Sequence, residues 1–157
     1  MCVDIMKTLL ILYHSQEFGN TKAMAEAIAE GAQFVGAKVT LVNTNKERFD
    51  IEKLRQFDVV AFGTPDYWGY IAGGLKVFVD DFYIVRKNNR QGLENKPYGL
   101  FYSHGGGGRV LEPFEKLFKA MKVGAKIGDT VESYGHPNES VLEACRQLGR
   151  QIIESIK

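Results

Sequence analysis

The stretch from Tyr13 to Thr21 carries hydroxyl, amide and glycine residues between an apolar run and a helical one. A strand, a tight turn and a helix start aim several backbone N–H groups and the positive end of the helix dipole at one place, where a phosphate binds well. The turn holds no Lys or Arg, so backbone amides and the hydroxyls of Ser15 and Thr21 would hold the phosphate, with Lys22 at the rim. The alternative is an ordinary loop in which Asn20 or Thr21 caps the helix.

Two further loops combine glycine with aromatic side chains. Residues 63–74 contain four glycines and three aromatic residues, among them the only tryptophan, Trp68, and residues 104–109 read His-Gly-Gly-Gly-Gly-Arg. A ring can stack on a flat ligand while Gly69 beside it reorients at little steric cost, and a glycine run lets the main chain approach closely. Each loop alone is equally consistent with rings packed on a helix or with a flexible turn. Together the three loops predict a phosphorylated, planar, aromatic ligand.

The elements that must position these loops alternate between strand and helix. Apolar runs predict five strands, the last one weak, at residues 8–13, 38–43, 57–63, 98–103 and 126–133. Helical spacing predicts helices after the first, third, fourth and fifth strands, and a brief helix over residues 51–56. The alternation implies right-handed crossovers and a parallel sheet covered by helices on both faces. The three loops then leave the carboxyl edge, where such sheets bind ligands.

Composition and charge limit the classes of protein to which this chain can belong. The 157 residues, 45% of them hydrophobic, suit a single domain over residues 1–157, with residues 1–6 as a disordered extension and either Met1 or Met6 as the start. A balance of 20 Lys and Arg against 19 Asp and Glu gives no sign of a nucleic-acid partner. No run reaches the roughly 20 apolar residues that span a bilayer, so we expect no membrane association. The two cysteines favour a cytoplasmic location over a disulfide framework, and no Cys, His and carboxylate set has metal-ligand spacing.

The chain resembles the flavodoxin-like FMN proteins, first in its phosphate loop. The family pattern is Ser/Thr-x-Thr-Gly-x-Thr, of which Ser15, Gly19 and Thr21 remain here. The chain has one extra residue and carries Glu17 and Phe18 in place of the middle threonine. Since a carboxylate beside a phosphate dianion is unfavourable, we expect the Glu17 side chain to point outward.

Other segments look more like two enzyme groups of that fold. Gly-Thr-Pro at residues 63–65, the segment 73–80 and the C-terminal segment 137–149 are similar to NAD(P)H:quinone oxidoreductases of the tryptophan-repressor-binding type and to NAD(P)H-dependent FMN reductases. The resemblance covers nearly all of residues 7–157. It implies an α/β, flavodoxin-like three-layer sandwich, with a five-stranded parallel sheet of order 2-1-3-4-5 and helices on both faces.

The resemblance also implies a cofactor site, transferred here residue by residue. It assigns the FMN phosphate to Ser15, Gly19, Asn20 and Thr21. It places along the isoalloxazine ring Thr64, Pro65, Tyr67, Trp68 and Gly69. It places at the pyrimidine end Ser103, His104, Gly105, Gly106 and Gly107. Gly69 is similar to the glycine whose carbonyl turns toward flavin N5 on one-electron reduction, and a negative charge on Asp66 would raise the cost of a negative reduced flavin.

The resemblance leaves two functional classes open. A flavodoxin carries single electrons between redox protein partners and commonly presents a strongly acidic face, whereas this chain has a net charge of +1. An NAD(P)H-dependent quinone or flavin oxidoreductase needs open space over one flavin face, which Tyr67, Tyr70, His104 and His136 could line, and some such enzymes are homo-oligomers. We expect the oxidoreductase, with NAD(P)H as transient reductant and a quinone or flavin as acceptor. Because the flavin carries the hydride chemistry, we expect no catalytic acid–base pair; His14 is expected to be structural.

Overall fold

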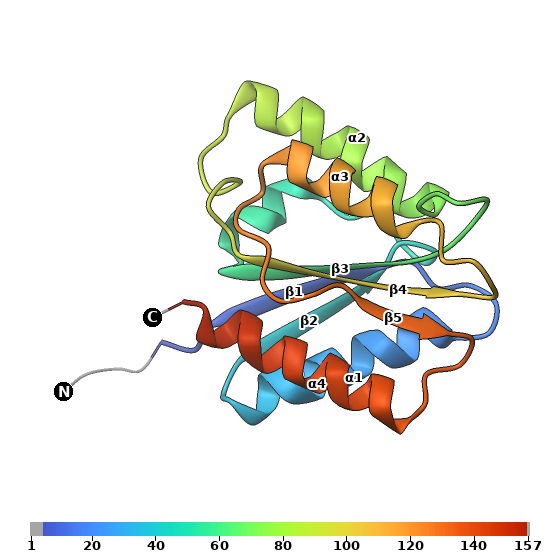
Figure 1. The fold of residues 1–157 in the computed structure, drawn as a ribbon. Helices are drawn as coiled ribbons and strands as arrows, with labels where there is room; N and C mark the ends of the chain where they lie inside the picture. The colour runs from blue at the N-terminus through green and yellow to red at the C-terminus, as the bar shows by residue number, and fades with distance from the viewer. Residues whose placement is uncertain (1–4, 157) are drawn as a thin grey trace.

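The computed structural model describes residues 5–156, so most of the extension expected over residues 1–6 lies outside the described residues. The strands are β1 Thr8–Tyr13, β2 Lys38–Asn43, β3 Val59–Pro65, β4 Tyr98–His104 and β5 Val131–Tyr134. The helices are α1 Asn20–Phe34, α2 Gly73–Asn88, α3 Leu111–Met121, α4 Glu139–Glu154 and the short 3₁₀ helix η1 Ile51–Gln56. Strand and helix alternate as the sequence predicted (Figure 1).

The five strands form one parallel sheet in the order β2-β1-β3-β4-β5, which confirms the predicted topology. The chain starts in β1, steps to the β2 edge and then crosses back over β1 to β3, so the order reverses between β1 and β3. In Figure 1 the arrows of β4 and β5 point to the right, and both termini lie at the opposite edge. The loops after β1, β3, β4 and β5 therefore meet at one carboxyl edge.

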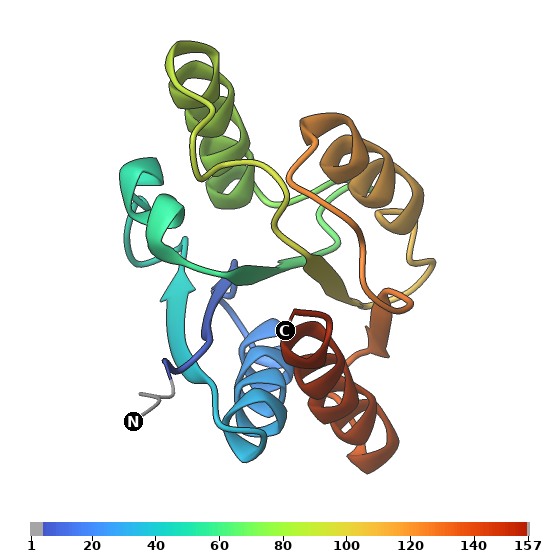
Figure 2. The ribbon, with the colours of Figure 1, turned by 90° about the vertical axis from the view of Figure 1, so that its left-hand side faces the viewer.

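Helices cover both faces of the sheet, and this explains why the central strands are largely apolar. α2 and α3 lie on one face and α1 and α4 on the other (Figure 2). Along β1, Leu10 and Leu12 belong to the core under α2 and α3, whereas Leu9 and Ile11 belong to the core under α1 and α4. Alternate side chains thus enter opposite cores, so each β1 residue from 9 to 12 is fully buried.

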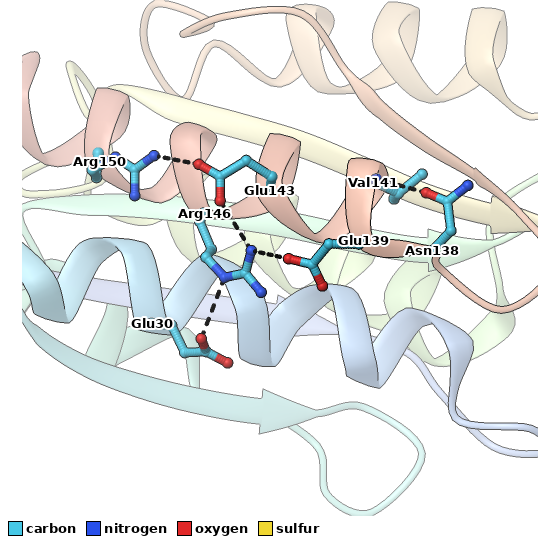
Figure 3. Close-up of polar contacts among 7 residues, drawn as sticks. All are labelled: Glu30, Asn138, Glu139, Val141, Glu143, Arg146 and Arg150. Carbon is cyan, nitrogen blue, oxygen red and sulfur yellow. Dashed lines mark hydrogen bonds and ion pairs between the residues drawn. The ribbon is translucent and has the colours of Figure 1, made fainter.

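α1 and α4 pack closely because glycines lie at their contact. A Cβ atom at Gly31 of α1 would lie 1.9 Å from the carbonyl oxygen of Arg146 in α4, and one at Gly149 would lie 2.2 Å from that of Ile28. At the surface of this contact Arg146 bonds Glu30 of α1 and two carboxylates of α4 (Figure 3). In the same view the Asn138 side chain accepts a hydrogen bond from Val141 N–H and caps α4.

Three strands have bounds other than the predicted ones: β4 extends one residue further, to His104, and β3 and β5 differ at both ends. β3 begins at Val59 instead of residue 57, because Asp58 bends away and its carboxylate accepts a 2.8 Å hydrogen bond from Thr8 N–H. β5 covers only Val131–Tyr134, since the chain near Lys126 joins the sheet through a single bridge to Tyr98. Over residues 5–156, no helix has the length and apolar character to cross a membrane, and no cluster of His, Cys, Asp and Glu has metal-binding geometry.

Candidate functional site

Two adjoining cavities lie along the carboxyl edge of the sheet. The first, of about 310 Å³, is lined by Ser15, Gln16, Glu17, Phe18, Gly19, Asn20, Thr21, Pro65, Asp66, Tyr67, Ser103, His104, Gly105 and Gly135. The second, of about 600 Å³, is lined by Asp66, Trp68, Gly69, Gly105, Gly106, Gly107 and Arg109. Asp66 and Gly105 line both cavities, so a ligand can extend from one into the other.

Every residue predicted to bind the cofactor, except Thr64, lines one of these cavities. Thr64 is fully buried; its hydroxyl donates to the Pro65 carbonyl at 2.7 Å and accepts from Ala72 N–H at 3.0 Å. Through these two hydrogen bonds Thr64 stabilises the loop after β3, and it has no place on the cavity wall. Tyr70 and His136, which the sequence placed over the flavin face, line neither cavity.

The start of α1 forms one end of the first cavity. Gly19 is the N-cap residue, with a left-handed φ of 74°, and no side chain in the described part of the chain caps the helix. The alternative in which Asn20 or Thr21 acts as the cap is therefore wrong. The N–H groups of the first turn have no partner within a helix, and here no capping side chain replaces one. The positive end of the helix dipole consequently faces the cavity wall.

Asn43, at the end of β2, holds the first loop in place. Its Oδ1 accepts from the backbone N–H of Ser15 at 3.0 Å, and its Nδ2 donates to the Ser15 carbonyl at 2.9 Å. The amide thus satisfies both backbone groups of Ser15 as a neighbouring strand would. Within residues 5–156 the Ser15 hydroxyl makes no hydrogen bond, and Ser15 lies on the cavity wall, where this hydroxyl is available to a ligand.

The other polar side chains of the first loop divide between support and surface. His14 is buried and bonds Thr44 Oγ1 at 2.9 Å and Gln16 Oε1 at 2.7 Å, so it is a structural residue as expected. Glu17 is exposed on the wall of the first cavity. Burial, and secondly the negative charge of Glu17, raise the pKa of Tyr67 above its ordinary value. The rim of this cavity therefore carries a negative charge that the sequence pattern of the family lacks.

The loop after β3 folds back as a two-residue hairpin turn. Tyr67 and Tyr70 exchange two backbone hydrogen bonds of 3.1 Å, and the residues between them, Trp68 and Gly69, have φ values of 60° and 74°. Positive φ at both central positions defines a type I′ turn. Glycine adopts this conformation freely, but a tryptophan there is strained. The turn presents the Trp68 ring to solvent at the edge of the second cavity.

Asp66 joins the loop after β3 to the loop after β4. One carboxylate oxygen accepts from Gly69 N–H at 2.8 Å and the other from Val110 N–H at 3.2 Å. Its own N–H donates to the Ser103 carbonyl at 2.8 Å. The carboxylate charge is thus partly compensated by two N–H dipoles, and the walls of the second cavity are held at a fixed separation.

His104, at the end of β4, lies in a cluster of polar and aromatic groups. Its Nε2 is 2.7 Å from Glu132 Oε1, and its Nδ1 is 3.1 Å from the backbone nitrogen of Gly106. Tyr102 donates to the other oxygen of Glu132 at 2.7 Å. The bonds from Tyr102 and then His104 hold the pKa of the Glu132 carboxyl below its ordinary value, while burial and this acceptor raise the pKa of Tyr102.

The sequence did not assign a role to several residues of this site, among them Gly135, Arg109, Asn43 and Glu132. Gly135 follows β5, so the rule that placed three loops at the carboxyl edge would also have indicated it. Arg109 lines the second cavity and forms no ion pair in the part of the chain that the structure describes. Asn43 acts by holding Ser15, and Glu132 acts by holding His104. No local sequence pattern identifies residues that act on a distant partner in this way.

Comparison with known proteins agrees with this geometry. The family model described as Flavodoxin matches residues 11–149. An NAD(P)H dehydrogenase (quinone) of Archaeoglobus fulgidus is 26% identical over 193 residues, which cover 95% of this chain and 97% of that protein. A flavodoxin of Aquifex aeolicus is 29% identical over 166 residues, which cover 95% of this chain and 86% of that protein. A solved flavodoxin structure from the domain Archaea superimposes with a TM-score of 0.80 at 23% identity, covering 94% and 97% of the two chains.

The fold and the edge site are those of the flavodoxin-like flavoproteins, a class of proteins that transfer electrons. With most of its length matched by the family model, the chain belongs to the flavodoxin family, whose members bind FMN.

Proposed function

We propose that this chain binds FMN across the two cavities, with the phosphate at the α1 end of the first cavity and the isoalloxazine ring extending from Pro65 and Ser103 in the first cavity into the second. The observation that carries the proposal is the pair of adjoining cavities, which share Asp66 and Gly105 and lie at the reversal in strand order. The first cavity offers the uncapped N-terminus of α1 and the Ser15 hydroxyl. The second is lined largely by glycines, which carry no side chains and let the main chain approach a ligand closely. These features fit a phosphorylated planar ligand.

The phosphate would be held without a cationic side chain, because no Lys or Arg is among the residues that line the first cavity. The backbone N–H groups at Asn20 and Thr21 and the Ser15 hydroxyl are the donors on offer. Trp68 would pack against the ring from the loop after β3, and Gly105–Gly107 would border it from the loop after β4. Bound FMN supplies the electron and hydride transfer, and the protein binds and orients it.

We further propose that the protein is an NAD(P)H-dependent quinone or flavin oxidoreductase, acting in the cytoplasm. The second cavity supports this, because the Trp68 ring at its edge is fully exposed and offers a surface on which a second planar molecule could stack. Arg109 at the same cavity has no ion pair among residues 5–156, so it could pair with the negative charge of a nicotinamide cofactor or of the reduced flavin. The quinone dehydrogenase of Archaeoglobus fulgidus, similar over nearly its whole length, agrees with this assignment.

The second candidate is a one-electron carrier that docks on redox proteins. Alignment length favours it: the alignment with the Aquifex aeolicus flavodoxin spans 166 residues, close to the 157 of this chain, whereas that with the quinone dehydrogenase spans 193. The dehydrogenase therefore has residues that this chain lacks.

Anaerobic mixing of the FMN-loaded protein with NADH or NADPH separates the two candidates. Rapid bleaching of the flavin absorbance, followed by reoxidation with benzoquinone, supports the oxidoreductase. Bound flavin that neither nucleotide reduces, and that holds a one-electron-reduced state during chemical reduction, supports the carrier instead. A protein that neither purifies with FMN nor takes it up contradicts FMN binding and both candidates.

A further inference from the structure

We infer that His104 is a positioning residue whose neutral form holds the glycine loop of the second cavity, so that protonation of this one ring loosens FMN binding. The inference rests on the proposed FMN site. It concerns the tautomer of His104, the conformation of Gly106 and the pH range in which the cavity keeps its shape.

The hydrogen bonds of His104 determine where its proton lies. The backbone N–H of Gly106 points at Nδ1 over 3.1 Å, and a backbone N–H is always a donor. Nδ1 must therefore carry a lone pair. The ring hydrogen of the neutral form is then on Nε2, where it donates to Glu132 at 2.7 Å. The two contacts agree on a single tautomer.

The surrounding side chains fix the ring in this orientation. The side chain of His104 is 5% exposed. Tyr102 stacks on it at a centroid distance of 5.8 Å and also donates to Glu132, and Tyr134 meets it edge-on at 5.1 Å. The imidazole cannot turn to follow the loop, so Nδ1 is a stationary acceptor.

The glycine loop has few other contacts that could order it. Gly106, Gly107 and Gly108 have φ values of 154°, 88° and 60°, a run that residues with side chains rarely adopt. A Cβ atom at Gly105 or Gly106 would meet nothing within 4 Å. In the described part of the chain the bond to His104 is the only hydrogen bond made by the backbone of Gly105–Gly107, so His104 carries much of the order of these glycines. Gly105 and Gly106 line the second cavity, so their order determines how well a flat ring fits there.

Protonation removes the acceptor. A protonated imidazole carries hydrogen on both nitrogens, and the hydrogen on Nδ1 then faces the N–H of Gly106. The carboxylate of Glu132 on β5 contacts Nε2, and the N–H of Gly106 contacts Nδ1. Two other ionisable side chains contact the His104 ring, Tyr102 and Tyr134. The charges of Asp66 and Glu115 act on Tyr102, and Arg109 lies on the loop itself.

Two substitutions of His104 separate its two nitrogens. In His104→Asn the Oδ1 atom can occupy the place of Nδ1 and accept from Gly106 N–H, but it does not titrate. In His104→Gln the polar group sits near Nε2, so contact with Glu132 is kept and the acceptor for Gly106 is lost. Circular dichroism and urea unfolding of each cofactor-free variant show whether the fold is kept.

The measurement is the FMN dissociation constant, from quenching of FMN fluorescence, between pH 8 and pH 5. The phosphate of FMN itself titrates near pH 6 and affects every variant alike. At each pH, the dissociation constant of the variant is therefore divided by that of the unaltered protein, and these ratios are compared. We expect the unaltered protein to lose about tenfold more affinity than His104→Asn as the pH falls. His104→Gln should bind about tenfold more weakly than the unaltered protein at pH 8. A constant ratio for His104→Asn, or full affinity in His104→Gln, overturns the inference.

A second readout does not depend on FMN and separates failure of this inference from failure of the proposed function. Nitrogen-15 chemical shifts of the His104 ring in the cofactor-free protein report the tautomer directly. We expect the hydrogen on Nε2 at pH 8, and faster hydrogen exchange at Gly106 once the ring is protonated. A ring with its hydrogen on Nδ1 overturns the inference even if FMN binds.

Discussion

The hydroxyls of Thr21 and Ser103 lie 2.8 Å apart, both buried, and join the first turn of α1 to the end of β4. These residues are 82 positions apart in the chain, and each lines the first cavity. The sequence suggested that Thr21 would bind the phosphate directly. Its hydroxyl also has a protein partner, so one effect of this residue is to fix the helix start relative to the sheet.

Ser103→Ala should lower the free energy of unfolding of the cofactor-free protein by about 1–3 kcal/mol, because it leaves the buried Thr21 hydroxyl unpaired. The double variant Thr21→Val with Ser103→Ala should recover most of this loss, since both partners become apolar. Urea unfolding of the two single variants and the double variant gives the coupling energy. Additive effects would show that the two hydroxyls do not interact.

Trp68→Gly should make the cofactor-free protein more stable by about 1 kcal/mol, because glycine has no penalty at a φ of 60°. The same change should weaken FMN binding by about 1–3 kcal/mol if the ring stacks on the flavin, with base stacking on aromatic side chains as the guide. Urea unfolding and fluorescence titration measure the two effects.

Trp68→Ala is the matched control for this position, since it removes the ring but keeps a Cβ atom at the strained φ. It should lose FMN affinity as Trp68→Gly does, without the gain in stability. Unchanged FMN affinity in both variants would mean that the ring lies away from the flavin.

The sequence predicted the order of elements, the sheet topology and the edge of the sheet that carries the site. These features follow from apolar periodicity and from the rules of parallel sheets, which are local or general. It did not predict the strain at Trp68, because a positive φ at tryptophan contradicts local preference and is imposed by the Tyr67–Tyr70 hairpin. It also missed Asn43 and Glu132, because their partners are distant in sequence and come close only when the chain folds.

Gly149→Ala should destabilise the protein by at least about 3 kcal/mol, since the new methyl would lie 2.2 Å from the Ile28 carbonyl and backbone cannot move aside as a side chain does. Gly73→Ala is the control: this glycine begins α2, its φ is not positive and a Cβ there meets nothing within 4 Å. That control should leave stability the same or raise it by up to about 1 kcal/mol. Thermal and urea unfolding of the cofactor-free variants test both, and equal effects would contradict the close approach of α1 and α4.

The pKa of Glu132, lowered in the folded protein, adds stability that depends on pH. A carboxyl whose folded pKa is depressed stabilises the fold above its ordinary pKa of 4.5, and this contribution is lost as the pH falls through the lower folded value. The stability difference between the unaltered protein and Glu132→Gln should therefore shrink as the pH falls below 4.5. Because half of the side chain is exposed, the effect should be small.

Urea unfolding at several pH values between 7 and 3 measures this difference. Tyr102→Phe removes the larger of the two causes of the lowered pKa and should reduce the pH dependence in part. A stability difference that stays constant through this range would contradict the role of Glu132.

The first cavity takes its walls from segments as far apart as Ser15 and Gly135. A chain emerging from the ribosome cannot complete this cavity until β5 has been synthesised and has docked beside β4. With FMN bound as proposed, only the finished fold would hold it, and free FMN at a hundred times its dissociation constant would stabilise that fold by about 2.7 kcal/mol through mass action. The concentration of free flavin would in this way set the apparent stability of the folded protein.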